Sequence, residues 1–244
     1  MKSYKCTLLC CCYNRKKTTT NFISSLQGSL REVENIEFNI LLLDDGDDNT
    51  GEFLKKKFSD LKIELYKGDG NFFWNGGMRY LMENLNVSVI DFFIFLNDDI
   101  VLKKDAIKSL FSTYFFSKKG KKVVSGKFIS KFSKKATYGI RDKNYQILNY
   151  DDGIFLDANL VLFPISVIKE IGLLSGKYRH SLGDWDYGLR LKAKGYSLII
   201  TDKPSGFCES NPIPNWFNSS KSIIERINSF HKTKKMSLVE QFHF

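Results

Sequence analysis

The chain has 244 residues, a formal net charge of +10 and 43% apolar residues. This length and apolar content suffice for one large α/β domain with a sizeable core. No apolar run reaches the roughly 20 residues that a membrane-spanning helix needs, and the first residues lack a secretory signal pattern, so we expect a cytoplasmic protein. The positive charge fits either a lysine-rich solvated surface or attraction to nucleic acid, an anionic membrane or phosphorylated substrates.

The first half of the chain predicts alternating strands and helices. Apolar runs of strand length are separated by stretches in which apolar residues recur at helical spacing. This alternation is typical of a doubly wound, mostly parallel sheet. In chain order we expect a strand at 6–13, a helix at 18–30, a strand at 38–43, a helix at 50–58, a strand at 63–66, a helix over 72–85, a strand at 92–96 and a helix after Asp105 as its N-cap.

The second half is less regular. The segment 128–150 is polar and lysine-rich, which indicates a loop or a hairpin insertion, and from Glu209 onward we expect an irregular, basic and aromatic tail. We therefore divide the chain into a single domain over 1–212, with halves 1–115 and 116–212, and a tail over 213–244. Within the second half we expect strands at 123–124, 160–163 and 197–200, a short helix from Pro164 to Gly172, and a helix that begins near Asp184 and ends at Gly195.

Five cysteines are present, four of them in one apolar stretch. Adjacent residues of a strand point to opposite faces, so neighbouring thiols cannot converge on one zinc ion. The odd count also argues against a disulfide framework. We expect small buried apolar side chains in a reducing compartment at Cys6, Cys10, Cys11, Cys12 and Cys208.

Two predicted parallel strands end in acidic residues. Asp44 and Asp45 follow the second strand, and Asn97-Asp98-Asp99 follow the strand at 92–96. Each cluster alone fits ordinary turn chemistry. Together they would line one crevice at the carboxyl ends of the strands, where ligands of such sheets bind. Mg²⁺ and Mn²⁺ prefer oxygen ligands of this kind and bind phosphates jointly with carboxylates.

Two further segments have both a structural and a functional interpretation. The glycine-rich loop 68–77 precedes a helix, so it could bring backbone amides to an anionic ligand, or its aromatic residues could simply pack in the core. Asp184 and Asp186 open a predicted helix, where carboxylates favour the helix dipole. One of them could instead act as a general base.

In this order, the motifs resemble those of inverting family-2 glycosyltransferases of the GT-A fold, within them the rhamnosyltransferase-like branch. The resemblance covers about residues 5–205. Cys12-Tyr13-Asn14-Arg15 is similar to the family's opening Thr-Tyr-Asn-Arg, and Leu43-Asp44-Asp45-Gly46 to its Val-Asp-Asp-Gly segment. Gly70-Asn71 through Gly76-Gly77 resembles its Gly-Asn…Gly-Gly loop. Leu96-Asn97-Asp98-Asp99 resembles its DXD-type motif, and 183–190 its Glu-Asp-x-Asp…Arg stretch.

The resemblance implies a Rossmann-like, mostly parallel central sheet flanked by helices, with a less regular acceptor-side half. It also implies transfer of a hexose or deoxyhexose from a nucleotide-diphosphate sugar, with UDP or dTDP expected, to a hydroxyl of a glycan or lipid-linked acceptor, with inversion. Mn²⁺ or Mg²⁺ would be the cofactor. The expected setting is synthesis of a cell-surface polysaccharide such as O-antigen or capsule, in the cytoplasm or at the inner face of the cell membrane, where the tail could contact anionic lipid.

The resemblance also implies roles for individual residues. Asp184 would be the base, supported by Asp186 and Arg190, and His180 and Trp185 would lie near the acceptor. Asp99, with Asp98 beside it, would hold the metal. Asp44 would contact the nucleotide base. The implied nucleotide-sugar-binding residues are Tyr13, Asn14, Arg15, Asp44, Asp45, Asn71, Trp74, Gly76, Gly77, Asn97 and Asp98.

Two departures from the family pattern bear on these roles. Asn97 stands where the DXD motif has its first Asp, so metal affinity would rest on Asp99 and water. Gly183 stands where the family has a Glu before the base. Three alternatives stay open. The first is a sugar nucleotidyltransferase, although the segment right after the first strand, Cys12-Tyr13-Asn14-Arg15, lacks the expected glycine-rich signature. The others are a basic nucleic-acid-binding protein, although no binding motif accompanies the charge, and a non-catalytic sugar-binding relative.

Overall fold

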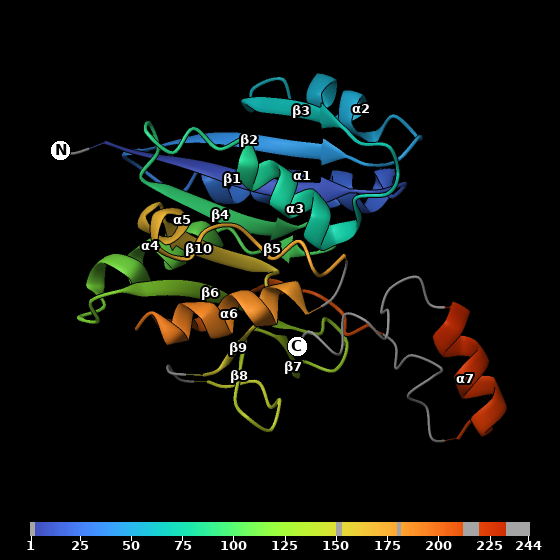
Figure 1. The fold of residues 1–244 in the computed structure, drawn as a ribbon. Helices are drawn as coiled ribbons and strands as arrows, with labels where there is room; N and C mark the ends of the chain where they lie inside the picture. The colour runs from blue at the N-terminus through green and yellow to red at the C-terminus, as the bar shows by residue number, and fades with distance from the viewer. Residues whose placement is uncertain (1–2, 150–152, 180–181, 212–219, 233–244) are drawn as a thin grey trace.

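The structure is a computed structural model that describes residues 3–149, 153–179, 182–211 and 220–232. Its centre is a nine-stranded sheet in the order β3-β2-β1-β4-β10-β6-β11-β5, with β7 paired to β6. Helices cover both faces (Figure 1). The chain therefore forms the expected α/β sandwich.

The first half forms the parallel part of the sheet, as predicted. β1 lies between β2 and β4, and all pairings from β3 to β4 are parallel. The elements are β1 (Tyr4–Cys12), α1 (Lys16–Leu30), β2 (Ile36–Asp44), α2 (Thr50–Lys57), β3 (Ile63–Lys67), α3 (Phe73–Glu83), β4 (Phe92–Asn97), β5 (Val101–Leu102) and α4 (Ala106–Phe116).

The second half is mixed in direction. β10 runs antiparallel to both β4 and β6, and β11 runs parallel to β6. A two-stranded sheet of β8 and β9 is separate from the large sheet. The elements are β6 (Lys122–Ile129), β7 (Ala136–Tyr138), β8 (Ile140–Arg141), β9 (Phe155–Leu156), β10 (Leu160–Pro164), α5 (Ser166–Ile171), α6 (Gly183–Ala193), β11 (Ser197–Phe207) and α7 (Ile223–Lys232).

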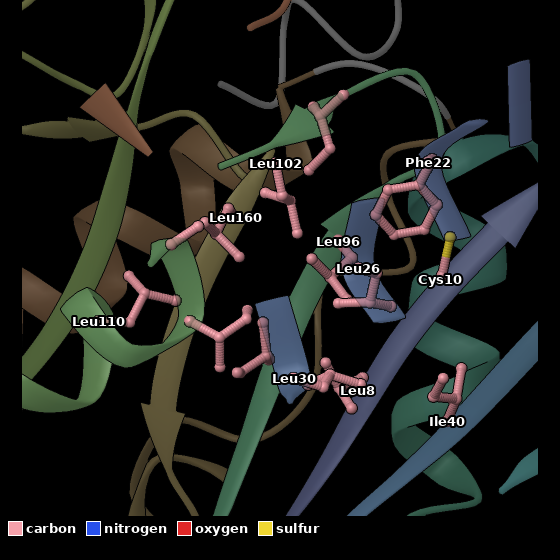
Figure 2. Packing of buried hydrophobic residues seen from close by; sticks show 14 of the residues in the cluster. Leu8, Cys10, Phe22, Leu26, Leu30, Ile40, Leu96, Leu102, Leu110 and Leu160 are labelled. Carbon is pink, nitrogen blue, oxygen red and sulfur yellow. The ribbon is translucent and has the colours of Figure 1, made fainter. Parts of the chain in front are cut away.

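Alternation along β1 divides the core into two clusters. Leu8 and Cys10 point to the face covered by α1, α2 and α4, where they pack with Phe22 and Leu26 of α1 (Figure 2). Leu9 points to the opposite face, covered by α3, α5 and α6. Because both faces are covered, β4 is apolar at every position up to Leu96, as a strand buried on both sides should be.

The cysteines follow the same alternation. Four are buried, Cys11 is partly buried, and all five are free thiols. Burial raises the pKa of Cys208 to about 12 and those of the four β1 thiols as well. The expectation that they act as small apolar side chains is therefore confirmed.

Two sequence expectations need correction, and a third is confirmed only in part. The segment beyond Glu209 is not wholly irregular, because α7 forms there. Asp105 is the N-cap residue of α4, as expected, but its side chain makes no capping hydrogen bond. Pro164 ends β10 rather than opening α5, which begins at Ser166. In the described parts of the chain, no helix combines the length and apolar composition that a bilayer crossing requires.

Candidate active site

The predicted acidic strand ends lie together at the carboxyl edge of the sheet. Cys12, the last residue of β1, pairs with Asp44 at the end of β2, and Cys11 pairs with Asn97 at the end of β4. Neighbouring strands lie about 5 Å apart, so the ends of β2 and β4 flank β1 at about 10 Å from each other. Both acidic clusters therefore border one edge, where ligands of open α/β sheets bind.

Asp44 closes the turn that leads into α2. Its side chain is buried, and its two oxygens accept hydrogen bonds from the backbone N–H groups of Gly46 (3.2 Å) and Gly51 (2.9 Å). The Lys67 ammonium lies 3.6 Å from Oδ2. These bonds stabilise a buried carboxylate. The expected contact of Asp44 with a nucleotide base stays a prediction.

Asp45 ties the glycine-rich loop to the end of β2. Its carboxylate accepts hydrogen bonds from the N–H groups of Gly70 (2.8 Å) and Phe72 (3.0 Å). Gly70 has a φ of 86°, which favours glycine. The Tyr13 ring, 53% exposed, lies against Gly70, and Asn71 follows it as an exposed residue. Tyr13, beside this loop, therefore presents an open aromatic face at the carboxyl edge.

Asn14 joins the ends of β1 and β2. Its Oδ1 atom accepts hydrogen bonds from the backbone N–H groups of Asp47 (2.8 Å) and Asp48 (3.3 Å). A Cβ atom at Gly46 would lie 2.2 Å from this Oδ1, so only glycine fits there. Asn14 thus shapes the turn that follows Asp44 and Asp45.

Arg15 lies between the two carboxylates that follow β4. Its guanidinium forms ion pairs with Asp98 and, at 3.4 Å, with Asp99. The other Asp98 oxygen accepts a hydrogen bond from the Thr19 hydroxyl at 3.0 Å. Burial raises the pKa of Asp98 to about 6, although the Arg15 charge opposes the rise. Both oxygens of Asp98 are therefore engaged by α1 and the turn before it.

Asn97 and Trp74 connect β4 to α3. The indole N–H of Trp74 donates to Asn97 Oδ1 at 2.7 Å, and its ring packs edge-on against Phe95. Gly77 of α3 lies so close to β1 and β2 that a Cβ there would be 3.0 Å from the Leu43 side chain. Gly76 meets no such obstacle, and its N–H donates to the Arg179 carbonyl at 3.4 Å. The predicted loop residues thus hold α3 against the edge.

A divalent cation fits this end of β4 through Asp99. Its Oδ1 atom is buried and has no hydrogen-bond partner. Mg²⁺ and Mn²⁺ are commonly held by one or two carboxylates together with substrate phosphates. No group of three metal-ligating side chains converges anywhere in the described ranges, so a bound ion would depend on such phosphates. Asp98 would first have to release Arg15 or Thr19, which favours Asp99 as the ligand.

Asp184 reaches the same edge from the second half of the chain. It lies in the first turn of α6, where one oxygen accepts from the Ala158 N–H (3.2 Å) and the other from the Trp185 N–H (3.0 Å). The backbone carbonyl of Asn159, the residue after Ala158, accepts a hydrogen bond from the Asn97 N–H at 3.0 Å. A short backbone path therefore joins Asp184 to the end of β4. Burial, and then the charge of Asp157, raise the pKa of Asp184 to about 7.

Asn75 occupies the space beside Gly183. Its amide nitrogen donates to the carbonyls of Ser175 (2.9 Å) and Tyr178 (2.6 Å), and its buried Oδ1 has no partner. A Cβ atom at Gly183 would lie 1.8 Å from that Oδ1. Gly183 is therefore matched to Asn75. Our assignment of site residues missed Asn75, although it lies within the glycine-rich loop singled out in the sequence.

Asp157 was also missed by the sequence analysis. It is buried, forms an ion pair with Arg141 at 2.8 Å, and accepts the indole N–H of Trp185 at 3.1 Å. It therefore anchors the residue next to Asp184. No local pattern marks Asp157, since it lies in an irregular stretch between two short strands.

Asp186 and Arg190 hold α6 to the end of α5 and the residues that follow it. The Arg190 guanidinium pairs with Asp186 at 2.8 Å and donates to the carbonyls of Ile171 (3.2 Å) and Leu173 (3.0 Å). These contacts position the helix that carries Asp184; the supporting role expected of both residues stays a prediction. His180 lies outside the described residues, so its expected acceptor contact stays a prediction.

Comparisons with known structures identify related folds. The chain is similar to Staphylococcus aureus TarS 1-349 in complex with UDP-GlcNAc, with 14% identity, a TM-score of 0.64, and coverage of 86% of this chain and 59% of that one. It is also similar to the mannosyltransferase PcManGT from Pyrobaculum calidifontis in complex with GDP-Man and Mn²⁺, with 11% identity, a TM-score of 0.61, and coverage of 87% and 58%. At these identities the likeness shows the shared fold.

The chain thus spans less than two thirds of either structure's length. No curated protein matches the sequence. The family model for glycosyl transferase family 2 matches residues 7–169. That range contains Asp44, Asp98 and Asp99 and ends before Asp184. Because the match covers most of the chain and the fold agrees with it, the chain belongs to glycosyl transferase family 2.

Proposed function

We propose that this protein transfers one sugar from a nucleotide-diphosphate donor to an acceptor hydroxyl, with inversion and with a divalent metal. The observation that carries the proposal is the approach of two carboxylates from opposite halves of the chain. Asp99 follows β4 with a buried oxygen that lacks a partner, and Asp184 is joined to the end of β4 through Ala158 and Asn159. A donor and an acceptor could meet between them.

On the donor side, we assign the nucleotide to the edge between the ends of β1, β2 and β3. Tyr13 offers an exposed ring beside Gly70 on which a base could stack. The diphosphate would lie toward Arg15 and the metal held by Asp99, which would together supply positive charge. Asp99 would hold Mn²⁺ or Mg²⁺, which when bound offsets the negative charge that builds on the leaving diphosphate. That one neighbour is a GDP-Man and Mn²⁺ complex supports this choice.

On the acceptor side, Asp184 is the base. Its carboxylate takes the proton of the acceptor hydroxyl as the oxygen bonds to the anomeric carbon and the bond from that carbon to the diphosphate oxygen breaks. A base works best when its pKa is near the operating pH, and that of Asp184 is raised to about 7. Attack from the face opposite the leaving group inverts the anomeric configuration.

The finer assignments follow from the motif resemblance. We propose UDP or dTDP as the nucleotide, a hexose or deoxyhexose as the sugar, and a rhamnosyltransferase-like place within the family. The acceptor would be a glycan or a lipid-linked acceptor in the synthesis of a cell-surface polysaccharide. The cytoplasmic side of the cell membrane is the corresponding location, and the net charge of +10 favours anionic lipid there.

A thermal-shift panel tests the proposal directly. The full chain is heated with UDP-, dTDP-, GDP- and CMP-sugars, each with and without Mn²⁺. We expect one nucleotide class to raise the melting temperature, because a ligand that binds only the folded state stabilises it. The rise should be larger with Mn²⁺ and should be lost in Asp99→Asn. Absence of a shift with every nucleotide sugar would overturn the assignment.

A further inference from the structure

Three aromatic rings form a cluster next to Asp184. Tyr145 lies in the segment between β8 and β9, Phe155 is in β9, and Trp185 is in the first turn of α6, following Asp184. The ring centroids are 5.1 Å apart for Tyr145 and Phe155, 5.2 Å for Tyr145 and Trp185, and 4.9 Å for Phe155 and Trp185. Figure 1 shows β8 and β9 side by side with α6 close to them.

The distances show which face of Tyr145 is open. Its ring is nearly parallel to both neighbours, at 15° to Phe155 and 20° to Trp185. Rings stacked on opposite faces of Tyr145 would lie at least about 7 Å apart, twice the contact distance between carbon atoms. Phe155 and Trp185 lie only 4.9 Å apart, so both are on the same side of Tyr145. The residue is nevertheless 50% exposed, and because both neighbouring rings lie on one side, we assign this exposure to the other face of the Tyr145 ring.

Hydrogen bonds and an ion pair hold the aromatic cluster in place. Asp157 accepts the Trp185 indole N–H and pairs with Arg141. The Arg141 guanidinium also donates to the Tyr145 carbonyl at 3.1 Å. Asp142 closes the turn by accepting the N–H of Gln146 at 2.9 Å. The same ion pair thus positions both the open ring and the residue next to the base.

We propose that the open face of Tyr145 is an acceptor subsite that binds a pyranose ring by stacking. The face of an aromatic ring carries negative charge density, which attracts the partly positive C–H groups on one face of a sugar. Three exposed polar residues adjoin Tyr145 and can hydrogen-bond sugar hydroxyls: Lys143, Asn144 and Gln146. An alkyl chain would gain little binding energy from a single aromatic ring that is surrounded by polar residues. The inference deepens the proposed function, on which it rests, by making the acceptor a saccharide.

Saturation-transfer NMR with a panel of methyl glycosides tests the subsite. The panel holds glucose, galactose, mannose, rhamnose and N-acetylglucosamine glycosides, and UMP forms a separate arm. We expect transfer to the ring protons of at least one glycoside. Tyr145→Ala should weaken that binding by about tenfold, whereas Tyr145→Phe should keep it, because the stacking face is retained.

Phe116→Ala is the matched control, since Phe116 is 85% exposed at the end of α4 and should leave glycoside binding unchanged. No transfer to any glycoside, equal transfer in Tyr145→Ala, or a dependence on Tyr145 for UMP alone would overturn the subsite. Thermal shifts with nucleotide sugars separate this outcome from failure of the proposed function. If nucleotide sugars raise the melting temperature of Tyr145→Ala as much as that of the parent, the donor site is supported regardless of the result with the glycosides.

Discussion

The side-chain oxygen of Asn75 lies where a side chain at Gly183 would have to begin. An ideal Cβ atom at Gly183 would stand 1.8 Å from Asn75 Oδ1 and 2.6 Å from Cγ. The two residues belong to different halves of the chain, Asn75 to α3 and Gly183 to α6. Their contact sets how closely the helix of the proposed base approaches the donor half, and it explains why the glutamate of the family pattern has no room at position 183.

We expect Gly183→Ala to destabilise the protein by about 1–3 kcal/mol, the usual effect of overpacking. The same substitution at Gly28 should be neutral or stabilising by up to about 1 kcal/mol, because a Cβ there meets nothing within 4 Å and alanine favours a helix. Urea unfolding measures both. In an Asn75→Ala background Gly183→Ala should cost less. Equal costs in both backgrounds would contradict the steric match.

Asp184→Asn should lower turnover by several orders of magnitude while leaving donor binding nearly unchanged, because it removes the base and little else. In the parent protein, kcat/KM should rise about tenfold per pH unit and level off above about pH 7, where Asp184 is ionised. Steady-state rates and donor calorimetry check both points. A rate that is flat between pH 5 and 8, or full turnover in the variant, would remove Asp184 from its role.

The same residue predicts a pH-dependent stability difference. The ordinary pKa of an aspartate is about 3.9, and folding raises that of Asp184 to about 7. At pH values between these two pKa values, Asp184 is protonated in the folded state and ionised in the unfolded state. Its contribution to the free energy of unfolding is therefore fully present below about pH 4 and is lost as the pH rises to 7.

Asp184→Asn should therefore match the parent near pH 4 and be more stable at pH 8, on the order of 2 kcal/mol after allowing for partial exposure. Comparing the two proteins at each pH cancels the other titrating groups. A variant that is less stable than the parent at pH 8 would show that burial does not oppose ionisation of Asp184.

Asp99→Asn should raise the Mn²⁺ concentration needed for half-maximal turnover by about tenfold or more. Even the loss of a residue that only hydrogen-bonds to a metal ligand lowers metal affinity by that much. Asp105→Asn is the control, because Asp105 is exposed nearby and makes no capping bond. Calorimetry of the nucleotide with and without Mn²⁺ gives a second measure. An unchanged Mn²⁺ requirement in Asp99→Asn would move the metal to another residue.

Arg190→Gln should destabilise the protein by about 1–3 kcal/mol, because two carbonyls and Asp186 lose a charged donor. Arg31→Gln removes an exposed ion pair with Asp60 and should cost about 1 kcal/mol or less. Urea unfolding compares the two, and donor affinity should be the same in both. A loss of donor affinity specific to Arg190→Gln would indicate direct contact with the nucleotide sugar.

The sequence by itself determined the features that depend on neighbours along the chain. Alternation put the neighbouring cysteines of β1 on opposite faces, helical spacing located α1 and α3, and the acidic residues after two apolar runs marked the carboxyl edge. These are local patterns, since side-chain direction repeats every two residues in a strand and every 3.6 in a helix. The order of the motifs, through their resemblance to the family, added Asp184 to the predicted site.

Only the tertiary structure decided what these residues touch. The antiparallel insertion of β10 beside β4, the match of Asn75 to Gly183, and the pairing of Asp98 with Arg15 and Thr19 join segments tens of residues apart. Such contacts depend on how the whole chain packs, and no local period encodes them. The contacts that bring Asp184 to the end of β4 therefore emerged only when both halves of the sheet were in place.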